Sequence, residues 1–179
     1  MCIPARGQER YCGEREAVAD RTRAKTNAMR VLDQRHIPYQ VYEFSPDIHS
    51  AIGVAEAVGL PVHEVYKTLV VMPPSGKKPI LMVVQGDLEV DLKRVGAALG
   101  EKGFRMATHK EAEQLSGLQV GGISALALLN KQWSVYVDAH ARALTEFVVS
   151  AGKRGVNLRL KVEDFMRITG ARWLEATEA

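Results

Sequence analysis

Residues 66–72 read Tyr-Lys-Thr-Leu-Val-Val-Met, a strand-like stretch that contains a single cation. Its β-branched residues, followed by Pro-Pro-Ser-Gly at residues 73–76, predict a strand that ends in a turn. Because side chains alternate along a strand, Lys67 shares one face with Leu69 and Val71, and the other four residues share the opposite face. Both faces are largely apolar, which predicts that the strand is buried.

Lys67 is the residue of this strand that needs an explanation. A lysine on a buried strand extends its ammonium to solvent, binds an anion, or has a lowered pKa. The first arrangement is ordinary for long cations, whereas the other two are typical of binding and catalytic sites. Lys67 is therefore a candidate catalytic residue, with a solvated lysine at the strand end as the alternative.

Composition places the chain among ordinary globular proteins. It has 179 residues, of which 46% are apolar and 25% charged, so one domain with a sizeable core is expected. No apolar run approaches the ~20 residues of a membrane-spanning helix, so no membrane partner is expected. The first residues lack the apolar segment of a signal peptide, which predicts a cytoplasmic location.

Charge is concentrated at the N-terminus. Residues 1–25 hold six basic and four acidic residues, which leaves about +1 of the net +3 for the rest of the chain. This balance excludes a protein that coats nucleic acid with its whole surface; no DNA partner is expected, but a local basic patch is allowed. Residues 1–24 are interpreted as a charged, disordered extension, and residues 25–179 as a single domain. Cys2 and Cys12 are interpreted as incidental thiols.

The remaining patterns predict a mixture of short strands and short helices. Helices are expected from the caps at Thr26 and Thr108 and from helical spacing elsewhere. A hairpin is expected between residues 66–72 and the apolar run at residues 79–85. The full prediction comprises helices over about 27–37, 52–58, 91–99, 108–115 and 163–169, and strands over 39–44, 66–72, 79–85, 104–107, 134–138, 146–150 and 156–162.

Several familiar chemistries lack their motifs. The five histidines have no H-E-x-x-H or other tight ligand spacing, so no metal site is expected. A Walker loop and a Gly-x-Gly-x-x-Gly after a strand are both absent from the sequence. Ser124 lacks the second glycine of a nucleophile elbow. What remains is Lys67, the small-residue loop at residues 120–125 with its paired glycines, and the Gly-Lys-Arg-Gly turn at residues 152–155.

Taken in order, these features closely resemble the YbaK/EbsC family of aminoacyl-tRNA deacylases, which is related to the editing insertion of prolyl-tRNA synthetase. The resemblance runs from about Thr26 to Leu174, and the joint order of its motifs is more specific than any one motif. The matching segments are Tyr-Lys-Thr-Leu-Val-Val at 66–71, Asp-Leu-Lys at 91–93, Ser-Gly at 116–117, Val-Gly-Gly-Ile-Ser at 120–124, Asp138, and Val-Ser-Ala-Gly-Lys-Arg-Gly at 149–155.

The resemblance implies an α+β fold, a mixed and mostly antiparallel β-barrel flanked by short helices. It implies trans-editing hydrolysis of a mischarged aminoacyl-tRNA, most typically Cys-tRNA(Pro), with prolyl-tRNA synthetase as a candidate partner and no metal or organic cofactor. The implied site has Lys67 as the catalytic residue and Lys153 and Arg154 as tRNA-binding residues. The implied substrate-binding residues are Tyr66, Gly121, Gly122, Ile123, Ser124 and Asp138.

An aminoacyl ester is already activated, so an editing enzyme has mainly to orient it and to stabilise the oxyanion formed on attack. The Lys67 ammonium and backbone N–H groups near residues 121–124 are suited to this role. No protein nucleophile is evident, so the attacking group is water or the thiol of a cysteinyl substrate. A solvated turn is the alternative reading of Lys153 and Arg154.

Two residues depart from the family pattern. Ala125 stands where the Gly-Gly-Ile-Ser motif continues with proline, and Ala151 stands where many members have glycine. Because proline fixes φ and alanine does not, Ala125 is expected to loosen the loop and affect amino-acid selectivity. Two other functions stay open: an Ala-tRNA deacylase of the same superfamily, and a non-catalytic module that binds aminoacyl-tRNA or a synthetase.

Overall fold

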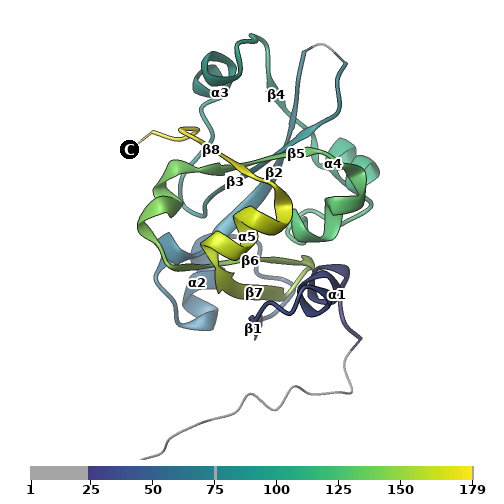
Figure 1. The fold of residues 1–179 in the computed structure, drawn as a ribbon. Helices are drawn as coiled ribbons and strands as arrows, with labels where there is room; N and C mark the ends of the chain where they lie inside the picture. Colours follow the sequence, from purple (N-terminus) through teal and green to yellow (C-terminus); the bar gives the residue numbers. More distant parts are fainter. Residues whose placement is uncertain (1–23, 75, 179) are drawn as a thin grey trace, which may run out of the picture.

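The computed structural model describes residues 24–74 and 76–178, which form two β-sheets with helices packed around them (Figure 1). The predicted extension up to residue 23, with Cys2 and Cys12, lies outside the described residues. The α-helices of the described part are α1 (Asn27–Gln34), α2 (Ala51–Val58), α3 (Leu92–Leu99), α4 (His109–Ser116) and α5 (Val162–Thr169), and its 3-10 helices are η1 (Val62–Glu64), η2 (Leu126–Lys131) and η3 (Ala139–Ala143).

The larger sheet has five strands in the order β4-β2-β3-β5-β8 and crosses the upper half of the molecule in Figure 1. The predicted hairpin is confirmed, because β2 and β3 pair antiparallel, with Lys67 opposite Val84. The next two pairings, β3 with β5 and β5 with β8, are parallel. The five strands are β2 (Tyr66–Met72), β3 (Ile80–Gln85), β4 (Arg105–Met106), β5 (Ser134–Asp138) and β8 (Arg172–Leu174).

The smaller sheet is antiparallel, in the order β1-β7-β6, with β1 (Gln40–Glu43), β6 (Glu146–Lys153) and β7 (Val156–Lys161). The predicted α+β class is confirmed, but the predicted barrel is wrong, because neither sheet closes. In the described residues, the bridge between Val65 and Val148 joins the two sheets at a single point. Both sheets therefore stay open. The first residues of β2 lie beyond the end of the short strand β4, and their unpaired side becomes important below.

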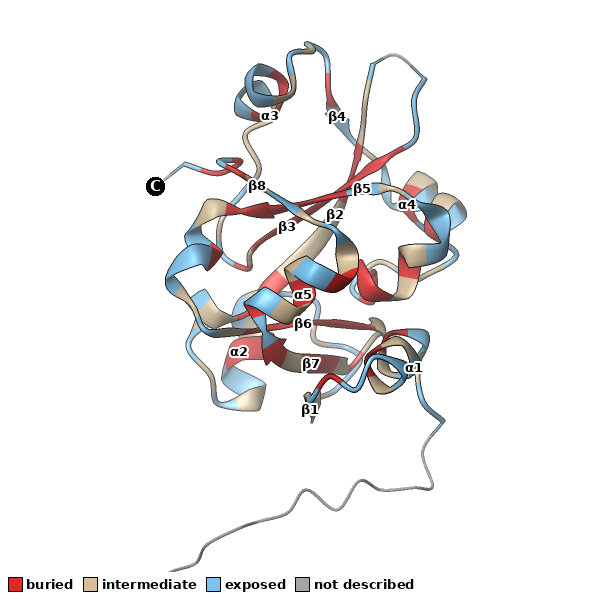
Figure 2. Cartoon of the chain, viewed as in Figure 1, coloured by how far each residue is buried: buried red, intermediate tan, exposed pale blue. Residues whose placement is uncertain are grey.

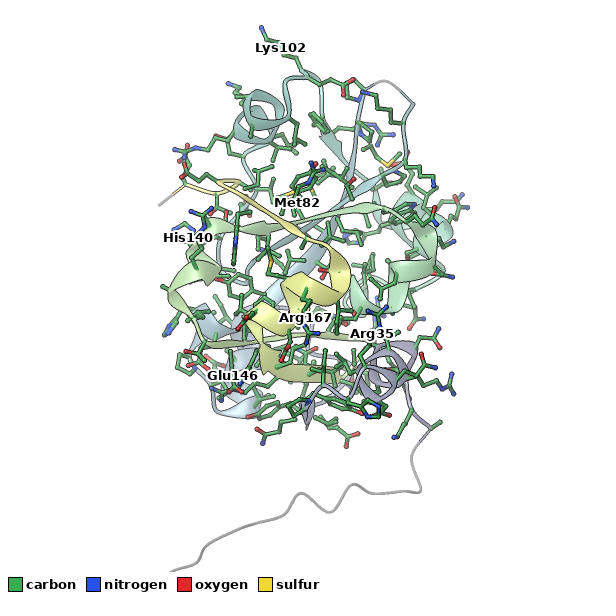
Figure 3. The ribbon with its side chains drawn as sticks, viewed as in Figure 1. Arg35, Met82, Lys102, His140, Glu146 and Arg167 are labelled. Atoms are coloured by element: carbon green, nitrogen blue, oxygen red, sulfur yellow. The ribbon has the colours of Figure 1, made fainter. Side chains whose placement is uncertain are left out.

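The larger sheet is buried on both faces (Figure 2). Leu81 and Val83 of β3 face the main core, which also contains Phe147 and Phe165. Alternate residues of the same strand, such as Met82, face a second cluster under α3. In Figure 3, Met82 lies inside the molecule whereas Lys102 extends into solvent. Because both faces are covered, β3 is continuously apolar rather than alternating.

The predicted alternation along β2 is confirmed. Tyr66 and Val70 belong to the main core, whereas Val71 is buried in the second cluster and Leu69 packs against it. Lys67 therefore leaves the strand on the side away from the main core, on the same face as Leu69 and Val71 of the second cluster.

Local sequence sets the helix boundaries where caps are present. Asp91 accepts hydrogen bonds from the backbone N–H groups of Lys93 and Arg94 at the start of α3. The predicted capping box of Thr108 and Glu111 is present at the start of α4. Such caps satisfy N–H groups that have no partner within the helix. None of the helices in the described part has the length and apolar content needed to cross a membrane.

Candidate active site

Lys67 lies half-buried on β2, and its Nζ donates a hydrogen bond to the backbone carbonyl of Gly86, 3.0 Å away. Burial lowers the pKa of Lys67, because an ammonium is less stable away from water, and the negative charges of Glu89 and Asp87 oppose this shift in part. Within the described residues, Lys67 forms no ion pair. A neutral carbonyl leaves the charge of the ammonium uncompensated, so Lys67 can still bind an anion.

The position of the Gly86 carbonyl depends on the lack of a side chain at Gly86. A Cβ there would lie 2.3 Å from the Cβ of Ala51 and 2.9 Å from the carbonyl oxygen of Val65. The N–H of Gly86 donates to that same Val65 oxygen at 2.8 Å. The close approach of α2 and the end of β3 thus fixes the carbonyl that holds Lys67.

A cavity of about 360 Å³ runs along the free edge of β2 and is lined by Lys67 among others. Strand β4 pairs only with Val71 and Met72, so residues 66–69 of β2 have no paired strand on that side within the described part of the chain. The carbonyl of Val70 accepts a hydrogen bond from Ala107 on this side. Since backbone groups alternate along a strand, the N–H and C=O of Thr68 also point to the open edge and the cavity.

The paired-glycine loop forms another wall of this cavity, to which Gly121 and Ile123 contribute. The N–H of Gly122 is occupied, because it donates to Gln119 O at 2.8 Å. The N–H of Val120 donates to Glu113 Oε1 at 2.9 Å. In the described residues, the N–H groups of Gly121 and Ile123 have no hydrogen-bond partner, so these two remain as donors for a ligand.

Gly121 has φ of 90°, a conformation that glycine adopts readily and other residues rarely adopt. Ala125, at the end of the loop, is buried and has φ of −62°. This is the value that proline would impose, so the packing around Ala125 provides the conformation without the ring. The backbone at Ala125 thus has the φ that proline favours, and the expected loosening of the loop stays a prediction.

Tyr66 is 2% exposed and lines the cavity. Its ring packs against Phe147, with the ring centroids 5.2 Å apart. Burial raises the pKa of the Tyr66 phenol, and the charges of Asp138 and Asp87 raise it further, so the phenol is neutral at physiological pH. Its buried hydroxyl has no hydrogen-bond partner among the described residues.

Three predicted substrate-binding residues, Gly122, Ser124 and Asp138, are not among the residues that line the cavity. Ser124 is 1% exposed, and its buried hydroxyl has no partner in the described part. Asp138 is fully buried and accepts hydrogen bonds from Thr177 Oγ1 and from the N–H groups of Ala176, Thr177 and His140. Burial opposes ionisation of Asp138, but the hydrogen bonds from His140, the Ala176 backbone and the Thr177 side chain prevail and lower its pKa.

Asp138 also contacts His140 Nδ1 at 2.5 Å, and His140 lies at the periphery of the molecule (Figure 3). These contacts make Asp138 an anchor for the C-terminal segment. They leave its carboxylate no free position for a substrate in this structure, which argues against the predicted binding role.

Sequence reasoning did not identify two buried polar residues of the cavity, Ser150 and Asn157. They face each other across β6 and β7. Ser150 Oγ accepts a hydrogen bond from the N–H of Gly152 at 3.3 Å. The side-chain amide of Asn157 forms no hydrogen bond within the described residues, which leaves one donor group and one acceptor for a ligand.

The two cations of the turn between β6 and β7 differ in their surroundings. Lys153 is exposed, whereas Arg154 is half-buried and its Nε donates to the carbonyl of Val120 at 2.6 Å. Lys153 is free to contact a phosphate. Arg154 has a partner in the paired-glycine loop, so its predicted tRNA contact depends on its remaining N–H groups.

A second cavity, of about 400 Å³, lies on another part of the surface and is lined by Asp87, Glu89, Asp91 and Glu178. Four carboxylates repel a polyanion such as tRNA. No three His, Cys, Asp or Glu side chains of the described residues are grouped as metal ligands. The cavity beside Lys67 is therefore the better candidate for a site that binds an ester of a nucleic acid.

Comparison with known proteins agrees with this choice. The model of the aminoacyl-tRNA editing domain matches residues 45–168. The chain belongs to the aminoacyl-tRNA editing domain family. The matched region contains every residue that lines the cavity except Phe44.

Individual relatives extend the match. EbsC of Enterococcus faecalis, provisionally named a Cys-tRNA(Pro)/Cys-tRNA(Cys) deacylase, is 37% identical over 88% of this chain and 96% of its own length. The proline–tRNA ligase of Chlamydia caviae is 26% identical over 68% of this chain but only 21% of the ligase. A crystal structure provisionally described as a trans-editing enzyme for prolyl-tRNA synthetase has a TM-score of 0.73 and 26% identity, covering 88% of this chain and all of that one.

Proposed function

We propose that this protein is a trans-editing aminoacyl-tRNA deacylase that releases a mischarged amino acid from tRNA, with Cys-tRNA(Pro) as the preferred substrate. Residues 25–179 form its single catalytic domain. The observation that carries the proposal is the arrangement of the cavity. Within the described residues, the Lys67 ammonium has only a neutral partner, and the N–H groups of Gly121 and Ile123 in the same cavity are unpaired.

This arrangement suits the hydrolysis of an ester. When water attacks the carbonyl carbon, negative charge develops on the carbonyl oxygen, and fixed donors lower the energy of that transition state. Lys67 supplies the charge, and the Gly121 and Ile123 N–H groups supply directed hydrogen bonds. Collapse of the intermediate breaks the bond to the ribose oxygen, which takes a proton, and releases the amino acid and tRNA. A cysteinyl thiol in place of water gives the same oxyanion and first releases a thiolactone.

Other residues of the cavity recognise the amino acid. The Asn157 amide and the Tyr66 hydroxyl are polar groups without partners in the described residues, and Thr68 offers backbone groups at the open edge of β2. These groups are placed to bind the amino group and side chain of the substrate. Gly122 and Ser124 support the loop rather than bind the ester. The name of EbsC and the match to prolyl-tRNA synthetases favour cysteine on proline tRNA.

The test is release of amino acid from tRNA charged with cysteine, alanine, serine or proline, each measured against spontaneous hydrolysis. We expect the fastest release from Cys-tRNA(Pro). Preferential release of alanine would instead indicate an Ala-tRNA deacylase. Binding of aminoacyl-tRNA without release of any of the four amino acids would identify a non-catalytic module and overturn the proposal.

The tRNA footprint should be small, because the described surface carries little net charge. We expect the logarithm of kcat/KM to fall with the logarithm of salt concentration with a slope of about −2 to −4, at ~0.7 to 0.9 per phosphate contact. Lys153→Gln should reduce the magnitude of this slope by about 0.7 to 0.9, the value of one contact. Lys102→Gln removes the same charge from an exposed position that does not line the cavity (Figure 3).

The control variant, Lys102→Gln, should have the same salt dependence of kcat/KM as the parent. A slope that is the same in Lys153→Gln as in the parent would show that Lys153 lies in a solvated turn and does not contact a phosphate.

Association with prolyl-tRNA synthetase would supply proline tRNA directly, and this partner stays a prediction. A cytoplasmic location, where charged tRNA is used, fits this function and also stays a prediction.

A further inference from the structure

Arg154 connects two parts of the chain that are distant in sequence. It lies on the turn between β6 and β7, and its Nε donates to the Val120 carbonyl, 34 residues away, at 2.6 Å. This is a short, charge-assisted hydrogen bond in a half-buried setting. Arg154 forms no ion pair within the described residues, so the Val120 carbonyl is its observed partner there.

The same turn also supports the paired glycines by direct packing. A Cβ on Gly121 would lie 3.6 Å from Nε and 3.7 Å from Cγ of Arg154. A Cβ on Gly122 would lie 2.8 Å from the backbone nitrogen of Arg154 and 2.9 Å from the carbonyl carbon of Lys153. The loop therefore rests on the turn, with the Arg154 side chain against the α-carbon of Gly121.

The hydrogen bond to Val120 bears on the N–H of Gly121, because both belong to one peptide group. A peptide group is planar and trans, so its C=O and N–H point in opposite directions. Fixing the carbonyl of Val120 on the Arg154 side thus fixes the direction of the Gly121 N–H away from it. The positive guanidinium also polarises the peptide group, which makes that N–H a stronger donor.

The preceding peptide group is fixed from another element. The N–H of Val120 donates to Glu113 Oε1 at 2.9 Å, and Glu113 belongs to α4. Val120 is thus held at its N–H by α4 and at its carbonyl by Arg154. The loop cannot rotate about this residue without breaking one of the two bonds.

We propose that Arg154 is a positioning residue that directs the Gly121 N–H toward the oxyanion of the substrate. The proposal rests on the deacylase function described above. This role differs from the one predicted from the Gly-Lys-Arg-Gly turn, in which Arg154 contacts a tRNA phosphate. A phosphate contact strengthens tRNA binding, whereas a positioning residue acts on the chemical step.

Kinetics of Arg154→Lys and Arg154→Ala separate the two roles. Lysine keeps the charge but lacks Nε and the planar fork. We expect both variants to lower kcat by roughly 10- to 100-fold, since misplacing a catalytic donor by about 1 Å costs up to ~10²-fold, with KM changed by no more than about two-fold. A normal kcat in either variant, with a raised KM and a reduced salt slope, would overturn the proposal in favour of a phosphate contact.

Arg159→Lys is the matched control. Arg159 lies on β7 of the same hairpin, and its Nε donates to Glu146 Oε2 at 3.1 Å. It does not line the cavity. The guanidinium of Arg159 also pairs with Glu64 at 3.3 Å. The control therefore removes a guanidinium with at least as many partners from the same hairpin, and we expect its kcat to equal that of the parent at matched folded fraction. A loss of kcat equal to that of Arg154→Lys would indicate general destabilisation and would count against positioning.

A measurement on the resting protein makes the proposal independent of activity. The backbone amide resonance of Gly121, observed by NMR, should move upfield and exchange faster with solvent in Arg154→Lys and Arg154→Ala, but not in Arg159→Lys. An unchanged Gly121 amide in both Arg154 variants overturns the proposal even if activity falls. If the parent hydrolyses no aminoacyl-tRNA, the deacylase function fails, while the NMR comparison still tests whether Arg154 directs the Gly121 N–H.

Discussion

Lys67→Ala is expected to lower kcat/KM for aminoacyl-tRNA hydrolysis by about 10²–10³, the usual cost of removing one well-placed electrostatic donor. The ammonium is half-buried and bonded to the neutral carbonyl of Gly86, so it faces the cavity with its charge uncompensated. Single-turnover rates with Cys-tRNA(Pro) measure the effect on the chemical step. Lys161→Ala, which removes an exposed lysine outside the cavity, is the control.

The melting temperature of Lys67→Ala should equal or exceed that of the parent, because the substitution removes a charge that is partly withdrawn from water. Lys67→Arg keeps the charge but brings a longer, planar group, and we expect it to be folded and nearly as inactive as the alanine variant. Hydrolysis at close to the parent rate in both variants would show that β2 is not the catalytic centre.

The lowered pKa of Lys67 also predicts a pH dependence. The ammonium is the active form, so kcat/KM should fall as the pH rises through a pKa below the ordinary value of 10.5. Between the lowered pKa and 10.5, the unfolded chain holds more protons than the folded one, so the free energy of unfolding of the parent should rise with pH. Denaturant titrations at several pH values should show this rise in the parent and its absence in Lys67→Ala.

Gly122→Ala is expected to be the most damaging small substitution in the loop. Its φ is not in the left-handed region, so the effect comes from contact alone. The new Cβ would lie 2.8 Å and 2.9 Å from backbone atoms of the adjoining turn, which cannot move aside as a side chain can. We expect the loop to shift and kcat to fall by up to ~10²-fold, with a loss of stability of about 1–3 kcal/mol from overpacking.

Gly100→Ala is the control that separates the loss of stability in Gly122→Ala from its effect on kcat. Gly100 ends α3 with φ of 70°, and a Cβ there would meet no atom within 4 Å. The strain of a left-handed alanine costs roughly 1–2 kcal/mol, so stability falls in this variant as well, but the cavity is untouched. Parent-like kcat in Gly122→Ala, measured at the same folded fraction as Gly100→Ala, would show that the loop tolerates displacement.

Much of the fold follows from local sequence. The bounds of β2 and β5 match the prediction, because β-branched runs are followed by residues that break a strand. The short strand β8 was missed because its pairing is not local. Strand β8 has three residues and pairs with β5 in a parallel register, so its partner is distant in sequence and no local pattern marks it. The strands are mostly antiparallel, as the resemblance implied, but the barrel was the wrong architecture because neither sheet closes on itself.

The candidate site was predicted in part. Lys67 is marked by its place in an apolar strand, whereas the paired glycines gain meaning mainly from the family resemblance. Ser150 and Asn157 were missed because serine and asparagine are mostly exposed in proteins, so a polar residue on a strand does not by itself indicate a buried site. In the structure, Val148 on the same face of β6 as Ser150 packs against Val65, where the two sheets meet. The sequence did contain one indication of a buried polar residue here, because Ser150 lies within the apolar run at residues 147–151.

The size of the cavity determines how much water is present beside the ester. Its 360 Å³ corresponds to roughly a dozen water molecules at about 30 Å³ each. Before substrate enters, this water solvates the backbone groups of Thr68 at the open edge of β2. We expect a small aminoacyl side chain to expel only part of it, so that where water is the attacking group it comes from molecules already beside Lys67. A bulky side chain would expel more, and we expect it to slow hydrolysis by removing this second reactant as well as by steric exclusion.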